Sequence, residues 1–217
     1  RDNRGLHICV TKTAGMGLFK KLRRSGTRLA LRFTEICTII GIRKNDENGP
    51  KEDFIMNNEV LKAMKTRRSI RKYKPEQITD EQLDAILEAG TYAATGMGKQ
   101  SPLIVVVQKP ELIAKLSKMN AAVMGSSNDP FYGAPTVLIV LADPEIGTYH
   151  EDGSLVMGNL MLAAHAVGVD SCWIHRAKEE FESAEGKELL KEWGLPENLV
   201  GIGHCILGYR DCEYPEA

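Results

Sequence analysis

A cluster of arginines around one serine is the strongest chemical signal in this sequence, because residues 67–73 read Arg-Arg-Ser-Ile-Arg-Lys-Tyr. Neighbouring cations repel one another unless an anion lies among them, and guanidinium groups beside a hydroxyl suit a phosphate. Arg67 and Arg71 are four residues apart, so they would project from one side if the preceding helix continued through them. A solvated basic turn is the alternative, since charge runs are commonly only surface. The residues alone leave both interpretations open.

The sequence lacks the other familiar phosphate-binding devices. Gly201, Gly203 and Gly208 lie inside an expected strand rather than between a strand and a helix, so they do not form a dinucleotide-binding loop. Gly98-Lys99 lacks both the hydroxyl residue after the lysine and the earlier glycine that a P-loop requires. We expect that any bound phosphate is held by side chains.

Cysteine and histidine residues form no catalytic or metal-binding pattern, so no metal site is expected. The five cysteines are scattered without a Cys-x-x-Cys pair, which argues against a disulfide scaffold, a zinc ribbon and an iron–sulfur cluster. We interpret His165 as a hydrogen-bonded core residue, His150-Glu151-Asp152 as a polar helix entrance, and Cys172 as a buried small hydrophobe. A protein without a catalytic triad can leave the chemistry to a bound cofactor.

Composition is ordinary for a globular protein, with 43% hydrophobic and 26% charged residues. No apolar run reaches the roughly 18 to 20 residues that cross a bilayer, which excludes a membrane-spanning protein at this stage. The N-terminal residues do not resemble a secretory signal. We therefore expect a cytoplasmic protein with reduced thiols.

The first 55 residues differ from the rest in charge. They carry 12 Lys and Arg against 6 Asp and Glu, whereas residues 56–217 carry 16 against 23. A helix could form over about 17–40, but its apolar residues make no sustained stripe, and the polar run 43–53 is typical of a linker. A nucleic-acid or membrane-surface arm is one interpretation. We favour a basic extension without a core, upstream of a start at Met56.

Regular hydrophobic patterns from Met56 onward predict a single domain over residues 56–217. Helices are indicated by capping residues and apolar spacings of three and four, and buried strands by continuous β-branched runs. Helices are expected to begin at Asn57 or Asn58 and at Thr79, and to span 110–119, 154–167 and 184–193; strands are expected over 103–107, 136–142, 171–174 and 200–209.

Five short motifs follow one another along this domain. They are Arg67-Arg68-Ser69-x-Arg71-x-Tyr73, Gly96-Met97-Gly98-Lys99-Gln100-Ser101-Pro102, Phe131-Tyr132-Gly133-Ala134-Pro135, Asn159-Leu160-Met161-Leu162-Ala163-Ala164 and Gly168-Val169-Asp170-Ser171-Cys172-Trp173-Ile174. From about Met56 to Tyr209 the chain resembles the nitroreductase family of FMN-dependent oxidoreductases. One such motif is weak, but five in register are specific. Residues 1–55 have no counterpart in that family.

The resemblance implies an α+β homodimer with a mixed central sheet flanked by helices, and one FMN at each of two sites across the interface. The arginine-serine cluster would hold the ribityl phosphate and the pyrimidine edge of the flavin. The turn before the Gln-x-Pro stretch would come from the other subunit, and the backbone after the Cys-Trp-Ile strand would lie near the reactive flavin nitrogen. The implied cofactor-binding residues are Arg67, Arg68, Ser69, Arg71, Thr95, Gly96, Gly98, Gln100, Ile174 and His175.

Two departures from the family pattern bear on this expectation. Many relatives have an asparagine where this chain has Gly98, so a polar contact to the flavin is missing or is replaced by backbone. Relatives also continue past the glycine-tyrosine strand end into a basic segment that binds phosphate and embraces the partner, whereas residues 210–217 here include Asp211, Glu213 and Glu216. If Ala217 is the native end, we expect weaker phosphate binding and a weaker dimer.

We therefore expect an FMN-dependent enzyme that transfers hydride from NADH or NADPH to a small electrophile, such as a nitroaromatic, a quinone or an activated alkene, by a ping-pong mechanism. The flavin would carry the chemistry, so no catalytic side chain is assigned. The alternatives are a dehalogenase or enone-reductase relative, a non-catalytic flavin-binding protein, and a nucleic-acid binder using residues 12–32. Neither a membrane nor a nucleic acid is the expected partner.

Overall fold

The structure, a computed structural model, describes residues 6–10 and 58–216. The helix expected over 17–40 and the linker expected over 43–53 lie outside the described residues. The described elements in chain order are β1 (Leu6–Val10), α2 (Glu59–Thr66), α3 (Asp80–Thr91), the 3-10 helix η1 (Gly96–Gly98), β2 (Leu103–Val107), α4 (Pro110–Val123), β3 (Thr136–Ala142), α5 (Tyr149–Ala166), β4 (Asp170–Ile174), α6 (Ala177–Glu182), α7 (Ala184–Glu192) and β5 (Val200–Gly208).

The described strands form one sheet in the order β1-β2-β3-β5-β4, and every neighbouring pair is antiparallel. The α+β class is confirmed, but the sheet is not mixed as expected: the parallel pairing among the described residues is limited to one bridge between Ser69 and Ser171. Runs buried on both faces are typical of parallel sheets. Here helices cover both faces of an antiparallel sheet. A strand that is buried on both faces therefore does not indicate whether its neighbours run parallel or antiparallel to it.

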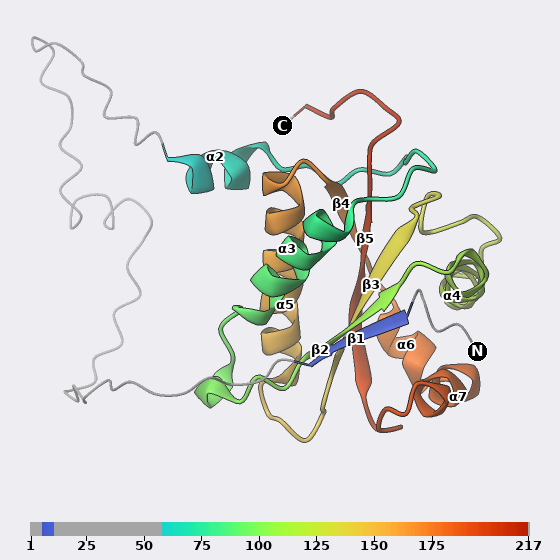
Figure 1. Cartoon of the computed structure of the whole chain (residues 1–217). Helices are drawn as coiled ribbons and strands as arrows, with labels where there is room; N and C mark the ends of the chain where they lie inside the picture. The colour runs from blue at the N-terminus through green and yellow to red at the C-terminus, as the bar shows by residue number, and fades with distance from the viewer. Residues whose placement is uncertain (1–5, 11–57, 217) are drawn as a thin grey trace, which may run out of the picture. The chain divides into compact units, whose positions relative to one another are not determined.

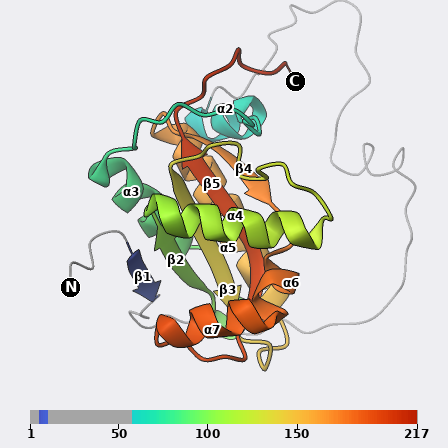
Figure 2. The ribbon, with the colours of Figure 1, turned by 90° about the vertical axis from the view of Figure 1, so that its right-hand side faces the viewer.

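Helices α3 and α5 lie on one face of the sheet and α4, α6 and α7 on the other, as Figures 1 and 2 show. Alternate residues of β2, β3, β4 and β5 point into one of two apolar clusters. In β2, Ile104 and Val106 pack toward α3 and α5, whereas Val105 and Val107 pack toward the opposite helices. Because successive side chains point to opposite faces, a strand covered on both sides must be apolar at every position.

The expected capping box at the start of α3 is confirmed. The backbone N–H of Gln82 donates to Thr79 Oγ1 at 3.2 Å, and the backbone N–H of Thr79 donates to Gln82 Oε1 at 3.1 Å. This exchange satisfies two N–H groups that have no partner within the helix. Leu83, Ile86 and Gly90 of this helix are buried, as their spacing predicts. α3 therefore packs its predicted face on α5 and the sheet.

Two helices differ from the sequence prediction. α5 begins at Tyr149 rather than at Ser154, because Glu151 and Asp152 stand in its first turn and complement the positive end of the helix dipole. The interpretation of residues 150–152 as a polar helix entrance is thereby confirmed. α6 was not expected, since six residues are too few for a helical period to be recognised.

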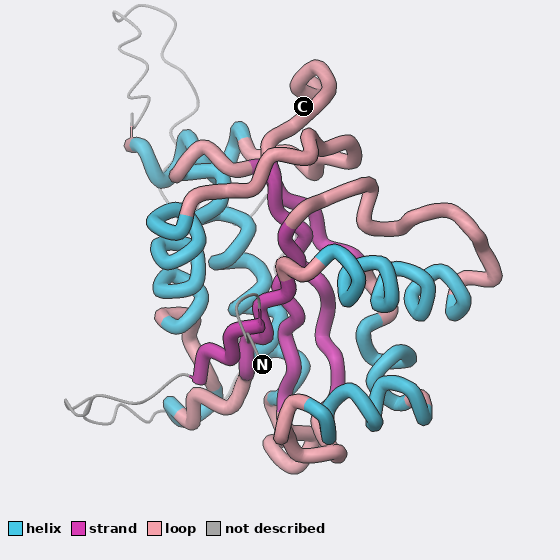
Figure 3. The backbone as a smooth tube through the Cα atoms, turned by 45° about the vertical axis from the view of Figure 1, so that its right-hand side comes forward, coloured by secondary structure: helices cyan, strands magenta, loops and turns pink. Residues whose placement is uncertain are grey.

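The loop after α2 and the segment after β5 run side by side at one end of the sheet, as Figure 3 shows. The N–H of Lys74 donates to the carbonyl of Tyr209 at 2.8 Å, and that of Asp211 donates to the carbonyl of Lys72 at 3.0 Å. Residues far apart in the sequence are therefore fixed together by backbone pairing. In the described ranges, no helix combines the length and the apolar character needed to span a bilayer.

Gly201→Ala is expected to lower the free energy of unfolding by about 1–3 kcal/mol, the usual cost of overpacking. A Cβ at this position of β5 would overlap the backbone carbonyl of Ala177 in α6, and a backbone atom cannot swing aside. Gly147→Ala is the control, because no atom lies within 4 Å of its Cβ position. Equal thermal midpoints for the two variants would contradict the close packing of α6 on β5.

Candidate functional site

The arginine cluster lies where β4 begins and β5 ends. α2 ends at Thr66, so the expectation that Arg67 and Arg71 share a helical face is wrong. Instead the chain crosses the sheet end: Ser69 bridges Ser171, and the N–H of Ile70 donates to the carbonyl of Ser171 at 3.1 Å. The helix stops because the register of this bridge inserts Ile70 into the core, where it is fully buried.

Arg67 carries a polar atom that its surroundings do not satisfy. Its Nη1 is buried and has no hydrogen-bond partner among the described residues. The hydroxyl of Ser171, part of the adjacent bridge, is likewise buried and unpartnered. Leaving such donors dry and unpaired costs about 1–3 kcal/mol for a neutral group and more for a charged one. This end of the sheet therefore has donors available for an acceptor from outside the described residues.

The neighbouring arginines are placed differently. Arg68 is engaged with backbone, since its Nη1 donates to the carbonyls of Lys65 at 2.8 Å and Arg67 at 2.9 Å, and its Nε donates to the carbonyl of Glu216 at 3.2 Å. Arg71 is exposed and makes no hydrogen bond or ion pair with a described residue. None of the three arginines therefore pairs with a carboxylate of a described residue, whereas Lys72 pairs with Asp211 at 3.0 Å.

The turn over Thr95–Gln100 is rigid and lies at the opposite end of the sheet. The N–H of Gly96 donates to the buried Asp152 Oδ1 at 2.8 Å, and the N–H of Gln100 donates to Thr95 Oγ1 at 3.1 Å. Gly98 is exposed with φ +66°, in the left-handed region that favours glycine. Asp152 was not recognised as a site residue from the sequence, although its place in a polar helix entrance was a signal.

Strand register separates this turn from the arginine cluster. Leu103 at the start of β2 pairs with Leu141 near the end of β3, and Ala142 pairs with Val200 at the start of β5. The arginine cluster lies at the other end of β5, whose nine residues span about 30 Å. One chain therefore does not bring the expected site residues together.

Ile174 and His175 occupy an intermediate position, where β4 ends opposite the middle of β5. Ile174 is buried and pairs with His204, whereas His175 is exposed. The carbonyl of His175 accepts a hydrogen bond of 2.8 Å from Nδ2 of the buried Asn120 in α4. Sequence reasoning missed Asn120, because an isolated asparagine within an amphipathic helix gives no signal of its partner.

Buried thiols and imidazoles supply no second candidate site. Cys172 and Cys205 are buried, as expected for Cys172, and burial raises the pKa of the Cys205 thiol. His165 makes its expected hydrogen bond, with Nε2 at 2.8 Å from Thr66 Oγ1, but it is only half-buried rather than in the core. In the described ranges, no three His, Cys, Asp or Glu side chains gather as metal ligands.

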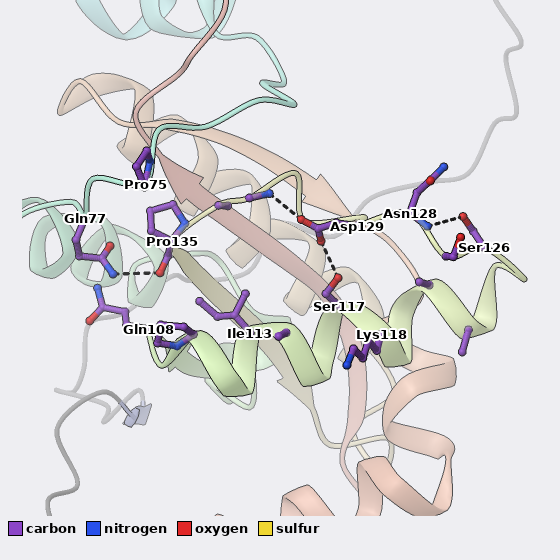
Figure 4. A pocket seen from close by; sticks show the side chains of 17 residues that line it. Pro75, Gln77, Gln108, Ile113, Ser117, Lys118, Ser126, Asn128, Asp129 and Pro135 are labelled. Atoms are coloured by element: carbon purple, nitrogen blue, oxygen red, sulfur yellow. Dashed lines mark hydrogen bonds between the residues drawn. The ribbon is translucent and has the colours of Figure 1, made fainter.

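A groove of about 800 Å³ lies between α4 and the loop over 126–135, and Figure 4 shows its lining. It contains none of the expected site residues. Several of its polar groups are already paired: Gln77 Nε2 donates to the carbonyl of Pro135 at 3.0 Å, and Ser117 Oγ donates to Asp129 Oδ1 at 2.6 Å. The groove therefore gives no chemical reason to place a flavin there.

Exposed apolar side chains of α2 and α5 are here called the α2–α5 patch. Its exposed members are Val60 and Met64 of α2, at 56% and 57% of their full exposure, and Leu155 of α5 at 51%. α2 buries no residue at all within the chain, although its apolar spacing predicted a packed face. An exposed apolar face on an amphipathic helix indicates a surface that another molecule covers.

Comparison with known proteins gives a consistent result. A family model described as nitroreductase family matches residues 64–130 and 121–209. A protein of Archaeoglobus fulgidus, provisionally named NADH dehydrogenase/NAD(P)H nitroreductase, is 34% identical over 156 residues, which are 70% of this chain and 85% of that protein.

Two similar crystal structures are nitroreductases with bound FMN. The structure from Bacteroides fragilis has 31% identity and a TM-score of 0.69, and the match covers 74% of this chain and 94% of that one. The structure from Desulfitobacterium hafniense has 29% identity and a TM-score of 0.68, with 75% and 94% covered. From the family match and these similarities, the chain belongs to the nitroreductase family, a family of oxidoreductases.

Proposed function

We propose that this protein is an FMN-dependent oxidoreductase that uses NADH or NADPH to reduce a small electrophile. The cofactor is supported by the FMN bound in two similar structures, and the reductant by the name of the archaeal relative. We further propose that the acceptor is a nitroaromatic, a quinone or an activated alkene. We also propose that the reaction follows a ping-pong order.

The observation that carries the proposal is the buried, unpartnered Nη1 of Arg67. A guanidinium stays charged at any relevant pH, and burying it without a counter-charge is unfavourable. The unpartnered hydroxyl of Ser171 stands beside the same bridge and adds a second donor. A dianionic phosphate ester, such as the one at the end of FMN, fits this donor set.

We assign the phosphate to Arg67, Ser69 and Arg71, with Ser171 as a fourth contact. Arg68 already donates to three backbone carbonyls, so its guanidinium holds the segment in shape and adds positive potential. Ser69 is half-buried at the bridge, and the exposed Arg71 is free to turn toward a ligand. The sequence expectation assigned the ribityl phosphate and the pyrimidine edge of the flavin to these residues and Arg68 together.

We propose that two copies of the chain complete each site through the α2–α5 patch. The turn over Thr95–Gln100 is about 30 Å from the arginine cluster of its own chain, measured along β5, so one chain cannot place both on one flavin. A two-fold related partner can supply the turn, with Gly96 and Gly98 offering backbone where the partner's flavin approaches closely. Covering Val60, Met64 and Leu155 would stabilise that arrangement.

The backbone at Ile174 and His175 is proposed to face the reactive part of the flavin. The hydrogen bond from Asn120 fixes the carbonyl of His175, so the peptide group after His175 keeps its orientation when ligands exchange. FMN, when bound, supplies the chemistry by accepting hydride from NADH or NADPH and giving it to the acceptor. The protein then needs no acid or base of its own, because the acceptor can take its proton from water.

Arg67→Ala is expected to weaken FMN binding by about 10- to 100-fold, since charge-assisted hydrogen bonds contribute roughly 1.5–3 kcal/mol. The protein should stay folded and become colourless. Fluorescence titration of FMN measures the affinity. Lys62→Ala removes an equal charge from the neighbouring α2, where Lys62 pairs only with Glu59, and serves as the control. Equal FMN affinity in wild type and Arg67→Ala would refute the phosphate assignment.

Met64→Asp is expected to convert the proposed dimer into monomers and to abolish FMN binding, because a carboxylate buried in the proposed interface would be desolvated without a partner. Sedimentation velocity with absorbance at the flavin wavelength measures the mass of the particle and whether flavin sediments with it. Met124→Asp, at the residue that follows α4 and is 49% exposed, is the control for an added surface charge. A Met64→Asp variant that sediments like the wild type would exclude this patch as the interface.

Anaerobic NADH or NADPH is expected to bleach the yellow flavin of the purified protein, and a nitroaromatic or quinone is expected to restore the colour. Parallel lines in reciprocal plots of initial rate would support the ping-pong order. A flavin that binds but is never reduced by either nucleotide would favour the non-catalytic alternative. Turnover with enones or halogenated substrates alone would favour the specialised relatives.

A further inference from the structure

Arg176, in the turn that joins β4 to α6, has a backbone conformation that its residue type disfavours. Its φ of +77° lies in the left-handed region, which costs a residue with a Cβ about 1–2 kcal/mol. Such conformations persist where the surrounding structure enforces them, and they concentrate at functional sites. A glycine would satisfy this turn without strain, so the arginine side chain itself calls for an explanation.

Asn120 fixes both the backbone and the side chain of this turn. It is fully buried on α4, its Nδ2 donates to the carbonyl of His175 at 2.8 Å, and its Oδ1 accepts from Nε of Arg176 at 3.0 Å. A carbonyl can only accept and a guanidinium can only donate, so the amide has one possible orientation. The amide nitrogen and the amide oxygen of Asn120 thus both help to position Arg176.

A buried pair lies close to this turn. Glu180 of α6 and His204 of β5 are fully buried, with Oε2 and Nε2 2.9 Å apart in a geometry short of an aligned hydrogen bond. His204 is also the strand partner of Ile174, the residue at which β4 ends. The turn is held from α4 through Asn120, and the N–H of Glu180 in α6 donates to the carbonyl of Arg176 at 3.1 Å.

Among the described residues, Arg176 has no counter-ion. Its Nε donates to the neutral amide of Asn120, and its terminal nitrogens make no hydrogen bond or ion pair with a described residue. A guanidinium oriented by a neutral partner keeps its full attraction for anions, and its two terminal nitrogens present a fork suited to a phosphate or carboxylate. A purely structural arginine would not need this orientation.

We propose that Arg176 determines substrate specificity by binding an anionic oxygen group of one of the two substrates that alternate at the flavin. This rests on the proposed function, in which Ile174 and His175 lie beside the reactive flavin ring. Both the nucleotide and the acceptor must then stack within reach of residue 176. The anionic group is either a phosphate of the nucleotide or a carboxylate of the acceptor.

The test uses the FMN-loaded protein and separates the two half-reactions by rapid mixing. Arg176→Gly removes the cation and suits the positive φ, so the turn is retained; Arg176→Lys keeps the charge and should restore part of the effect. The donors are NADPH, NADH and the uncharged 1-benzyl-1,4-dihydronicotinamide. The acceptors are 4-nitrobenzoate and its uncharged analogue 4-nitrobenzamide. Lys187→Ala, an exposed cation on α7, is the matched charge control.

Arg176→Gly is expected to lower the second-order rate constant by about 10- to 100-fold for the anionic substrates of one half-reaction, with the uncharged substrates unchanged. Loss with NADPH alone identifies the 2′-phosphate, loss with both nucleotides the pyrophosphate, and loss with 4-nitrobenzoate alone an acidic acceptor. Equal loss with all five compounds, or no loss with any, overturns the proposal. A wild-type protein that binds no FMN would instead refute the proposed function.

Discussion

Backbone pairing at the end where β4 begins and β5 ends is the interaction on which the candidate site depends. The bridge between Ser69 and Ser171 and the bonds around Lys74 and Tyr209 hold the arginine segment against the sheet. These bonds end α2 at Thr66 and bury Ile70. They also bury Nη1 of Arg67 without a hydrogen-bond partner among the described residues. The backbone register therefore leaves a positive charge that an anion would stabilise.

The same sheet separates the parts of the proposed site. Its length sets Thr95–Gln100 apart from the arginine cluster, and β4 forms an edge of the described sheet. An edge strand leaves backbone groups available to a neighbour. None of the apolar residues of α2 is buried among the described residues, and these residues of one chain do not bring the proposed site together. Association of two copies would resolve both through one contact.

Buried polar side chains hold two parts of the proposed site by hydrogen bonds. Two of the proposed ligand-facing segments are held by a buried polar side chain from another element: Asp152 of α5 holds Gly96, and Asn120 of α4 holds His175. Loops fixed in this manner keep their geometry while substrates exchange, which favours reactions that depend on stacking and distance. The two polar residues are buried without large penalty because their hydrogen-bonding groups are used.

Much of the fold follows from the sequence alone. The continuous apolar runs of β2 and β3 predict strands covered on both faces, the Thr79–Gln82 capping box predicts the start of α3, and the arginine motif locates the phosphate-binding candidate. These signals are local, because a strand, a cap or a charge cluster depends on residues close together in the chain.

Only the tertiary structure decided that the sheet is antiparallel, that Arg67 and not Arg68 has an unpartnered nitrogen, and that Asn120, Ser171 and Glu180 support the site. Those features depend on which strands lie side by side and which side chains meet across long sequence separations, and neither is encoded in the spacing of neighbouring residues.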